Sequence, residues 1–180
     1  KNDSKIAGTV VRSNLDDKMT LCSNYQVNNS STYTKTINRA LSLVSSSNTI
    51  KILNDNTDSS SAIVSKNVTI DTNDKTVTRT STINVNSGYT LTMNGTGRII
   101  NTSSRVFSVS GTLKIQGGTY ETTGSSGNVD TIYLNGSGNI VLNDVNEINI
   151  WSDYGCGSAI MSDSSNSINV NATSAGIKLY

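Results

Sequence analysis

Apolar and polar residues alternate in short runs that return at long intervals along most of this chain. From Asn48 onward one such run recurs six times, at residues 49–53, 68–70, 91–93, 113–115, 140–142 and 168–170. The first apolar residues of successive runs lie 18, 23, 22, 27 and 28 positions apart. Period-two alternation is typical of a strand with one buried face, and its return at such intervals predicts a solenoid with one repeat per turn.

Two further families of alternating strands run in step with the first. The second family comprises residues 83–85, 107–109, 132–134, 159–161 and 177–179. The third is weaker and comprises residues 76–78, 98–100, 119–121 and 148–150. Three strands per turn, separated by turns rich in Gly, Asn and Ser, predict a parallel coil of triangular cross-section over residues 47–180. The absence of Pro fits strands that are paired on both sides.

The segment before the first coil has a different period. Residues 36–46 place Ile37, Ala40, Leu41 and Val44 on one helical face, with Thr34 or Thr36 positioned to cap the helix start. Solenoids need a cap to cover the apolar side chains and strand edges at an open end. We therefore expect residues 1–46 to form an N-terminal cap, in which two short strands, 9–11 and 19–22, join this amphipathic helix.

The predicted coil explains the unusually polar composition of the chain. The chain of 180 residues contains 29 Ser, 23 Thr and 24 Asn, together 42%. Leu, Ile, Val and Phe make up 23%, above the roughly 20% below which highly charged chains fail to collapse. A solenoid core is one coil wide, so few apolar residues per turn suffice. The polar majority then forms the solvent face and the corners.

Several classes of function are excluded or disfavoured by the same counts. There is no His, which removes every imidazole base or metal ligand. The net charge is +1, with scattered Lys and Arg, which argues against a nucleic-acid partner. No run approaches the roughly 18 apolar residues of a membrane helix, so no membrane insertion is expected. We also expect no cofactor and no metal site.

The two cysteines are predicted to be free thiols. Cys22 falls in the expected cap and Cys156 in the fifth coil. Four coil steps of about 4.8 Å would separate them by roughly 19 Å, far beyond disulfide reach. The prediction depends on where the N-terminal segment runs.

Two stretches carry a resemblance to a known class of fold. Residues 36–41 (TINRAL) followed by 48–53 (NTIKIL) resemble the start of right-handed parallel β-helix proteins of the pectate-lyase-like class, where a capping helix precedes an apolar first strand. Residues 111–120 (GTLKIQGGTY) are similar to the coil motif of bacterial cell-surface adhesins of that fold. The resemblance covers residues 32–180. It implies an all-β, right-handed parallel β-helix of about five to six coils with an N-terminal capping helix.

The resemblance leaves two functional hypotheses. Its catalytic signatures do not transfer, because the chain has no His and no Arg-Ile-Lys motif, and Asp144 and Glu147 stand without a column of acids on successive turns. We expect a non-catalytic module of a secreted or cell-surface bacterial protein, acting in adhesion or as a stalk and contacting glycan or a host or cell-surface component. The alternative is a fragment of a polysaccharide lyase, hydrolase or phage tailspike. The start at Lys1 and the stop at Tyr180 after a strand lead us to expect a longer chain with further domains.

Two lengthened loops mark the candidate site. Residues 122–130 and 152–157 replace much shorter loops in the earlier coils, and adjacent coils are about 4.8 Å apart. The loops should therefore lie side by side. The residues that they gather are Glu121, Asp130, Trp151, Asp153 and Tyr154. Aromatic faces beside carboxylates suit sugar binding, by stacking and by hydrogen bonds to hydroxyls.

Other interpretations of these residues stay open. The loops can be tolerated insertions, and Trp151 can pack inward as the last residue of its strand. Asp130 with Asp153 supplies too few oxygens for calcium, and Glu121 with Asp153 matches a glycosidase pair only as any two rim acids would. Tyr133 and Met161 are expected as outer-face neighbours that contact a missing domain.

Overall fold

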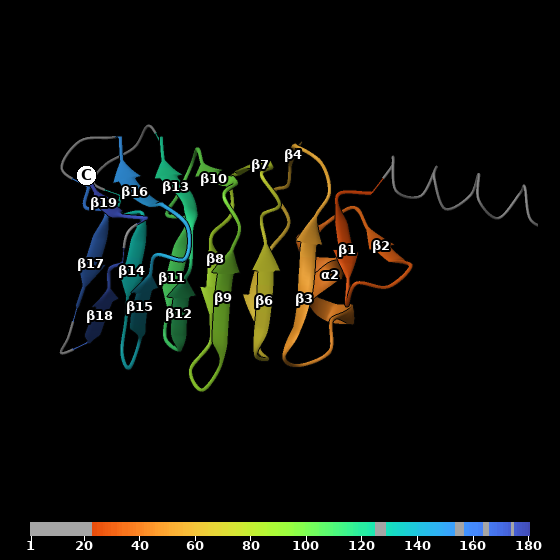
Figure 1. The fold of residues 1–180 in the computed structure, drawn as a ribbon, viewed down its shortest axis with the longest axis horizontal. Coiled ribbons are helices and arrows are strands. Elements are labelled where there is room, and N and C mark those ends of the chain that lie inside the picture. Colours follow the sequence, from red (N-terminus) through yellow and green to blue (C-terminus); the bar gives the residue numbers. More distant parts are fainter. Residues whose placement is uncertain (1–22, 125–128, 154–156, 164–165, 174) are drawn as a thin grey trace, which may run out of the picture.

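The expected all-β fold is confirmed: the chain forms a parallel β-solenoid of about five turns, and the described residues contain one helix, which precedes the coil. The structure is a computed structural model that describes residues 23–124, 129–153, 157–163, 166–173 and 175–180. The turns stack along the long axis of the molecule, and the cap covers one end (Figure 1). The two strands expected at 9–11 and 19–22, and both cysteines, lie outside the described residues.

Three sheets form the walls, and the chain visits them in a fixed order. Sheet A contains, in chain order, β1 (Tyr25–Val27), β2 (Thr32–Thr34), β3 (Asn48–Ile52), β6 (Val68–Asp71), β9 (Thr90–Asn94), β12 (Thr112–Ile115), β15 (Asn139–Asn143) and β18 (Ser167–Asn171). Sheet B contains β4 (Asn56–Thr57), β7 (Thr76–Arg79), β10 (Arg98–Asn101), β13 (Gly118–Thr122), β16 (Ile148–Ser152) and β19 (Ile177–Leu179). Sheet C contains β5 (Ala62–Val64), β8 (Ile83–Val85), β11 (Phe107–Val109), β14 (Ile132–Leu134) and β17 (Ile160–Ser162).

The core is a stack of inward side chains on successive turns. In sheet A, for example, Leu91, Leu113 and Ile140 pair in register and are fully buried. Inside the coil, Phe107 of sheet C packs against Tyr120 of sheet B with ring centroids 5.4 Å apart. Every second side chain on a strand points to the core, and the core is only one coil wide, so few apolar residues per turn are enough to fill it.

One strand belongs to a different sheet from the one expected. Residues 177–179 were assigned to the second strand family, which corresponds to sheet C, but β19 pairs with β16 in sheet B, Ile177 against Ile148. An alternating Ile-Lys-Leu run fits any wall of the coil, because the pattern encodes a buried face and not a partner. Only the A–B–C order of the chain identifies the wall.

The register between the first two coils also differs from the expected one. The sequence pattern placed Ile50 beside Val68, whereas Ile50 pairs with Ile70. A shift of two residues keeps the same side chains inside, so alternation alone cannot detect it. The correction brings Thr49, and not Lys51, into the outward line with Thr69 and Thr92.

The capped end combines the expected helix with a hairpin that the pattern did not indicate. Helix α2 (Ile37–Leu43) is shorter than the expected 36–46; Thr36 is its N-cap and its side chain accepts a hydrogen bond from the Arg39 amide. Strand β1 pairs antiparallel with β2 and with β3. The hairpin therefore covers the first edge of sheet A, and the apolar side of α2 covers the N-terminal end of the solenoid core.

A line of buried polar side chains runs through the corner between sheets B and C. Arg79, Asn101 and Thr122 pair in register, and each is no more than 1% exposed. The Asn101 amide donates to the carbonyls of Ser81 and Arg105 and accepts from the amides of Ser103 and Ser104. Through these bonds Asn101 holds the loop that leads from sheet B to sheet C on its own turn and contacts the corresponding loop one turn earlier.

The outer face of sheet C carries the expected pair of Tyr133 and Met161, which are neighbours in register. The Arg105 guanidinium lies 4.3 Å from the centre of the Tyr133 ring, and the Tyr133 hydroxyl donates to Asp163 at 2.8 Å. The neighbours are confirmed, and their contact with another domain stays a prediction.

Candidate functional site

Strands β13 and β16 position the centre of the candidate site. Glu121 and Trp151 are partners in register on these strands and point outward from sheet B. Ile150, one residue before Trp151, is fully buried in the core. Alternation therefore turns the indole outward, where Trp151 is 37% exposed. The alternative interpretation, in which Trp151 packs inward, is wrong.

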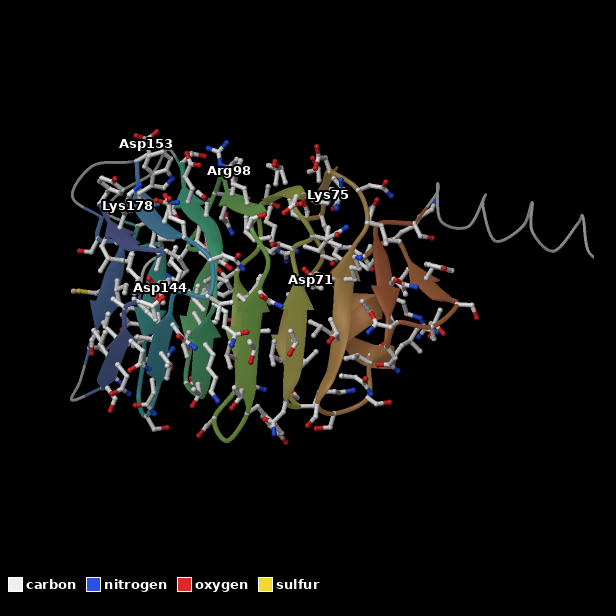
Figure 2. All side chains as sticks on the ribbon, in the orientation of Figure 1. Asp71, Lys75, Arg98, Asp144, Asp153 and Lys178 are labelled. Atoms are coloured by element: carbon white, nitrogen blue, oxygen red, sulfur yellow. The ribbon has the colours of Figure 1, made fainter. Side chains whose placement is uncertain are left out.

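The site is a hollow of about 210 Å³ on the outer side of sheet B, lined by Glu121, Trp151, Ser152, Asp153 and Tyr180. The rings of Trp151 and Tyr180 lie with their centres 5.8 Å apart and are tilted by 54°. Asp153 is exposed at the rim. Figure 2 shows Asp153 and Arg98 along the same border of the solenoid, over the strands of sheet B. Two aromatic rings and a carboxylate thus face one recess.

Glu121 is the buried member of the lining set. It is only 6% exposed, and Arg98 engages Oε2 of its carboxylate through Nε at 2.9 Å and also through Nη2. Arg98 lies on β10, one turn before Glu121. A carboxylate that is held by a guanidinium in this way acts as a fixed wall of the hollow. Both contacts with Arg98 reach Oε2, and the pairing of Glu121 with Asp153 as glycosidase acids stays a prediction.

Asp130 lies at the loop but not in the hollow. Its Oδ1 accepts a hydrogen bond from the Ser158 amide at 2.9 Å, so the carboxylate links two successive turns. The expected grouping of Asp130 with the other four residues is therefore not seen in the lining. Tyr154 lies outside the described residues. The structure brings together Glu121, Trp151 and Asp153.

Hydrogen bonds between turns hold the rim in place. The Asp153 amide donates to the Thr122 carbonyl at 2.9 Å, and the Ser152 hydroxyl donates to the Val129 carbonyl at 2.8 Å. The Thr131 hydroxyl donates to the Trp151 carbonyl at 2.6 Å. These bonds fix the backbone on both sides of the indole, so the Trp151 ring is presented from a rigid strand end.

Two participants were missed by sequence reasoning. Tyr180 follows β19, and the assignment of residues 177–179 to the wrong sheet placed it far from Trp151. Arg98 was seen only as part of a strand. Its outward position, together with that of Glu121 one turn later, could have indicated an ion pair, because the two strands were already aligned.

A second ion pair borders the site on β19. Lys178 Nζ lies 2.9 Å from Glu147 Oε1, and both side chains are about half exposed. The hydrogen bond from Lys178 holds the pKa of the Glu147 carboxyl below its usual value, and Glu147 raises the pKa of the Lys178 ammonium. Both groups are therefore charged at neutral pH.

In the part of the chain that the structure describes, no group of three or more Asp, Glu or Cys side chains could hold a metal ion. Among the same residues, no helix has the length and apolar character needed to cross a membrane.

Comparison of the chain with protein-family models, with curated proteins and with solved structures found no match.

Proposed function

We propose that this chain is a non-catalytic β-solenoid module of a secreted or cell-surface protein that binds glycan through the Trp151 hollow. The observation that carries the proposal is the exposed indole of Trp151 beside Tyr180 and Asp153 in one recess. Aromatic rings supply a flat apolar surface for the C–H face of a sugar, and a carboxylate accepts hydrogen bonds from sugar hydroxyls. A stiff solenoid suits the role of an adhesin or stalk, because stacked turns hold such a site at a fixed distance along an axis.

The engagement of Glu121 by Arg98 supports binding rather than hydrolysis. In the alternative, a fragment of a polysaccharide lyase, hydrolase or tailspike, a hydrolase would need a second catalytic acid opposite Asp153, and one oxygen of Glu121 is already taken by Arg98. Asp130, the other candidate acid, is bonded to the Ser158 amide.

A glycan array probed with the purified chain tests the proposal, followed by titration of each hit. Trp151 is the single tryptophan of the chain, so its fluorescence reports on the site directly. We expect a hit that changes Trp151 emission and is lost in Trp151→Ala. The matched control is Tyr89→Ala, which removes an aromatic side chain of similar exposure, 39%, away from the hollow. Binding that survives Trp151→Ala, or an array without hits, would refute the proposal.

A further inference from the structure

The aromatic surface of the site runs across turns and not along a strand. Ile100, Glu121 and Trp151 form one outward line across β10, β13 and β16. Tyr180 continues this line on the next turn, because Leu179 pairs with Ile150 and the Tyr180 ring packs against Trp151. A ligand that stacks on both rings must therefore extend along the axis of the solenoid.

The charges beside this line are already paired, except for one. Arg98 is bound to Glu121, and Lys178 is bound to Glu147. Among the described residues, Asp153 has no ion-pair partner, although it lines the hollow. The two cations and three carboxylates leave an excess of one negative charge. An acidic ligand would therefore meet the repulsion of Asp153 beside two described cations, Arg98 and Lys178, that are each already paired with a carboxylate.

Asp153 also defines what the ligand must offer. An ionised carboxylate only accepts hydrogen bonds, so its partner has to be a donor such as a sugar hydroxyl. Hydrogen bonds to a charged acceptor are stronger than those between neutral groups. The hollow therefore combines two stacking rings with one strong acceptor.

We infer that the Trp151 hollow selects a neutral, hydroxyl-rich linear glycan over an acidic one, and that the glycan lies along the solenoid axis across at least the two turns that carry Trp151 and Tyr180. This inference rests on the proposed glycan binding and adds the class and the direction of the ligand.

The test titrates Trp151 fluorescence with neutral hexasaccharides (cellohexaose, xylohexaose and mannohexaose) and with hexagalacturonate, each at low and at high NaCl concentration. We expect at least one neutral probe to bind at least tenfold more tightly than hexagalacturonate at low salt. High salt should reduce this difference in affinity between the neutral probe and hexagalacturonate, because salt screens the repulsion from Asp153. Asp153→Asn should also reduce the difference in affinity, by improving the binding of hexagalacturonate. Tyr180→Ala should weaken the binding of the neutral hexasaccharide about tenfold, whereas Tyr89→Ala should not.

The outcomes separate this inference from the function on which it rests. Equal or tighter binding of hexagalacturonate that still depends on Trp151 would overturn the selectivity and leave glycan binding intact. An unchanged ratio in Asp153→Asn would likewise overturn it. Neutral binding that is unaffected by Tyr180→Ala would overturn the axial placement. Loss of all glycan binding, on the array as well as with these probes, would overturn the proposed function itself.

Discussion

Asp58 and Arg79 face each other inside the solenoid on adjacent turns, with Oδ2 and Nη1 3.9 Å apart and both side chains almost completely buried. The same carboxylate accepts hydrogen bonds from the Tyr25 hydroxyl at 2.8 Å and from the Ile37 amide at 2.6 Å. Arg79 donates in addition to the carbonyls of Ser60 and Ser81. One carboxylate therefore ties the hairpin, the start of α2 and the second turn together.

Asp58→Asn should destabilise the fold strongly. Removal of one partner from a buried pair leaves an uncompensated charge and costs about 3–5 kcal/mol. Denaturant unfolding followed by circular dichroism measures the change. Glu147→Gln is the matched control, because it breaks an ion pair that is half exposed and should change stability little. Equal effects of the two substitutions would contradict the role of burial.

Stability should fall on the acid side of about pH 4. Burial raises the pKa of Asp58, but hydrogen bonds from Ser60, from the Ile37 amide and from Tyr25 outweigh burial and lower it. The Gly176 amide, which donates to Asp144 at 2.6 Å, lowers the pKa of Asp144 as well. A carboxyl with a lower pKa in the folded state stabilises the protein above its unfolded pKa of about 3.9, and this stabilisation is lost as the pH falls through the folded value.

The free energy of unfolding measured from pH 6 to pH 2.5 checks this expectation, and Asp144→Asn separates the two groups. Its amide can accept from only one of the Thr173 and Gly176 amides that the carboxylate now binds. We expect faster hydrogen exchange at residues 175–180 in this variant at neutral pH, with the cap unchanged. A stability curve that stays flat down to pH 3 would disprove the pH dependence.

Gly138→Ala should be far more damaging than Gly88→Ala. A Cβ at position 138 would overlap the carbonyl oxygen of Val109 on the preceding turn, so two turns would have to move apart. Gly88 has a φ of +82° but open space around it, so alanine there costs only the left-handed strain of about 1–2 kcal/mol. Thermal unfolding measures the loss of stability in each variant. A larger loss of stability for Gly88→Ala than for Gly138→Ala would refute the argument.

Thr122→Val should stabilise the protein. The Thr122 hydroxyl is buried and finds no hydrogen-bond partner among the described residues, and an unpaired buried polar group costs about 1–3 kcal/mol. Valine has nearly the same shape and suits a strand. Thr131→Val is the matched control, since that buried hydroxyl donates to the Trp151 carbonyl and its loss should destabilise by about 1 kcal/mol. Opposite signs are expected in denaturant unfolding, and a destabilised Thr122→Val would show that the hydroxyl is satisfied.

The strand families could be predicted because alternation reports directly which side chains are buried. What alternation does not report is the partner of each strand, which is why β19 was assigned to the wrong wall and Tyr180 was missed at the site. Strand β4 (Asn56–Thr57) is polar and two residues long, so no pattern marked it. The first-coil register was off by two residues for the same reason, because both alternatives bury equivalent faces.

Corner glycines illustrate a second limit of the sequence. Gly88, Gly111, Gly136 and Gly138 all precede strands of sheet A, where a glycine at a corner ordinarily indicates a positive φ. Gly88 and Gly136 do have positive φ, at 82° and 54°. At Gly111 and Gly138 the reason is instead the carbonyl oxygens of the preceding turn, which leave no room for a Cβ. Contacts between turns are set by the three-dimensional stacking, which a linear pattern does not contain.

The hairpin and α2 close one end of the stack, and this gives the molecule an order of assembly. Each strand of sheet A from β6 onward pairs with a strand that precedes it by 20 to 28 residues, as from Ile50 to Ile70 and from Ile140 to Ile168. Among the described strands, each wall pairs only strands of neighbouring turns, so it can form without a contact from a distant part of the chain. Solenoid folding propagates from one repeat to its neighbours, so we expect the cap, which precedes the coil in the chain, to serve as a nucleus onto which turns add one at a time as the chain emerges from the ribosome.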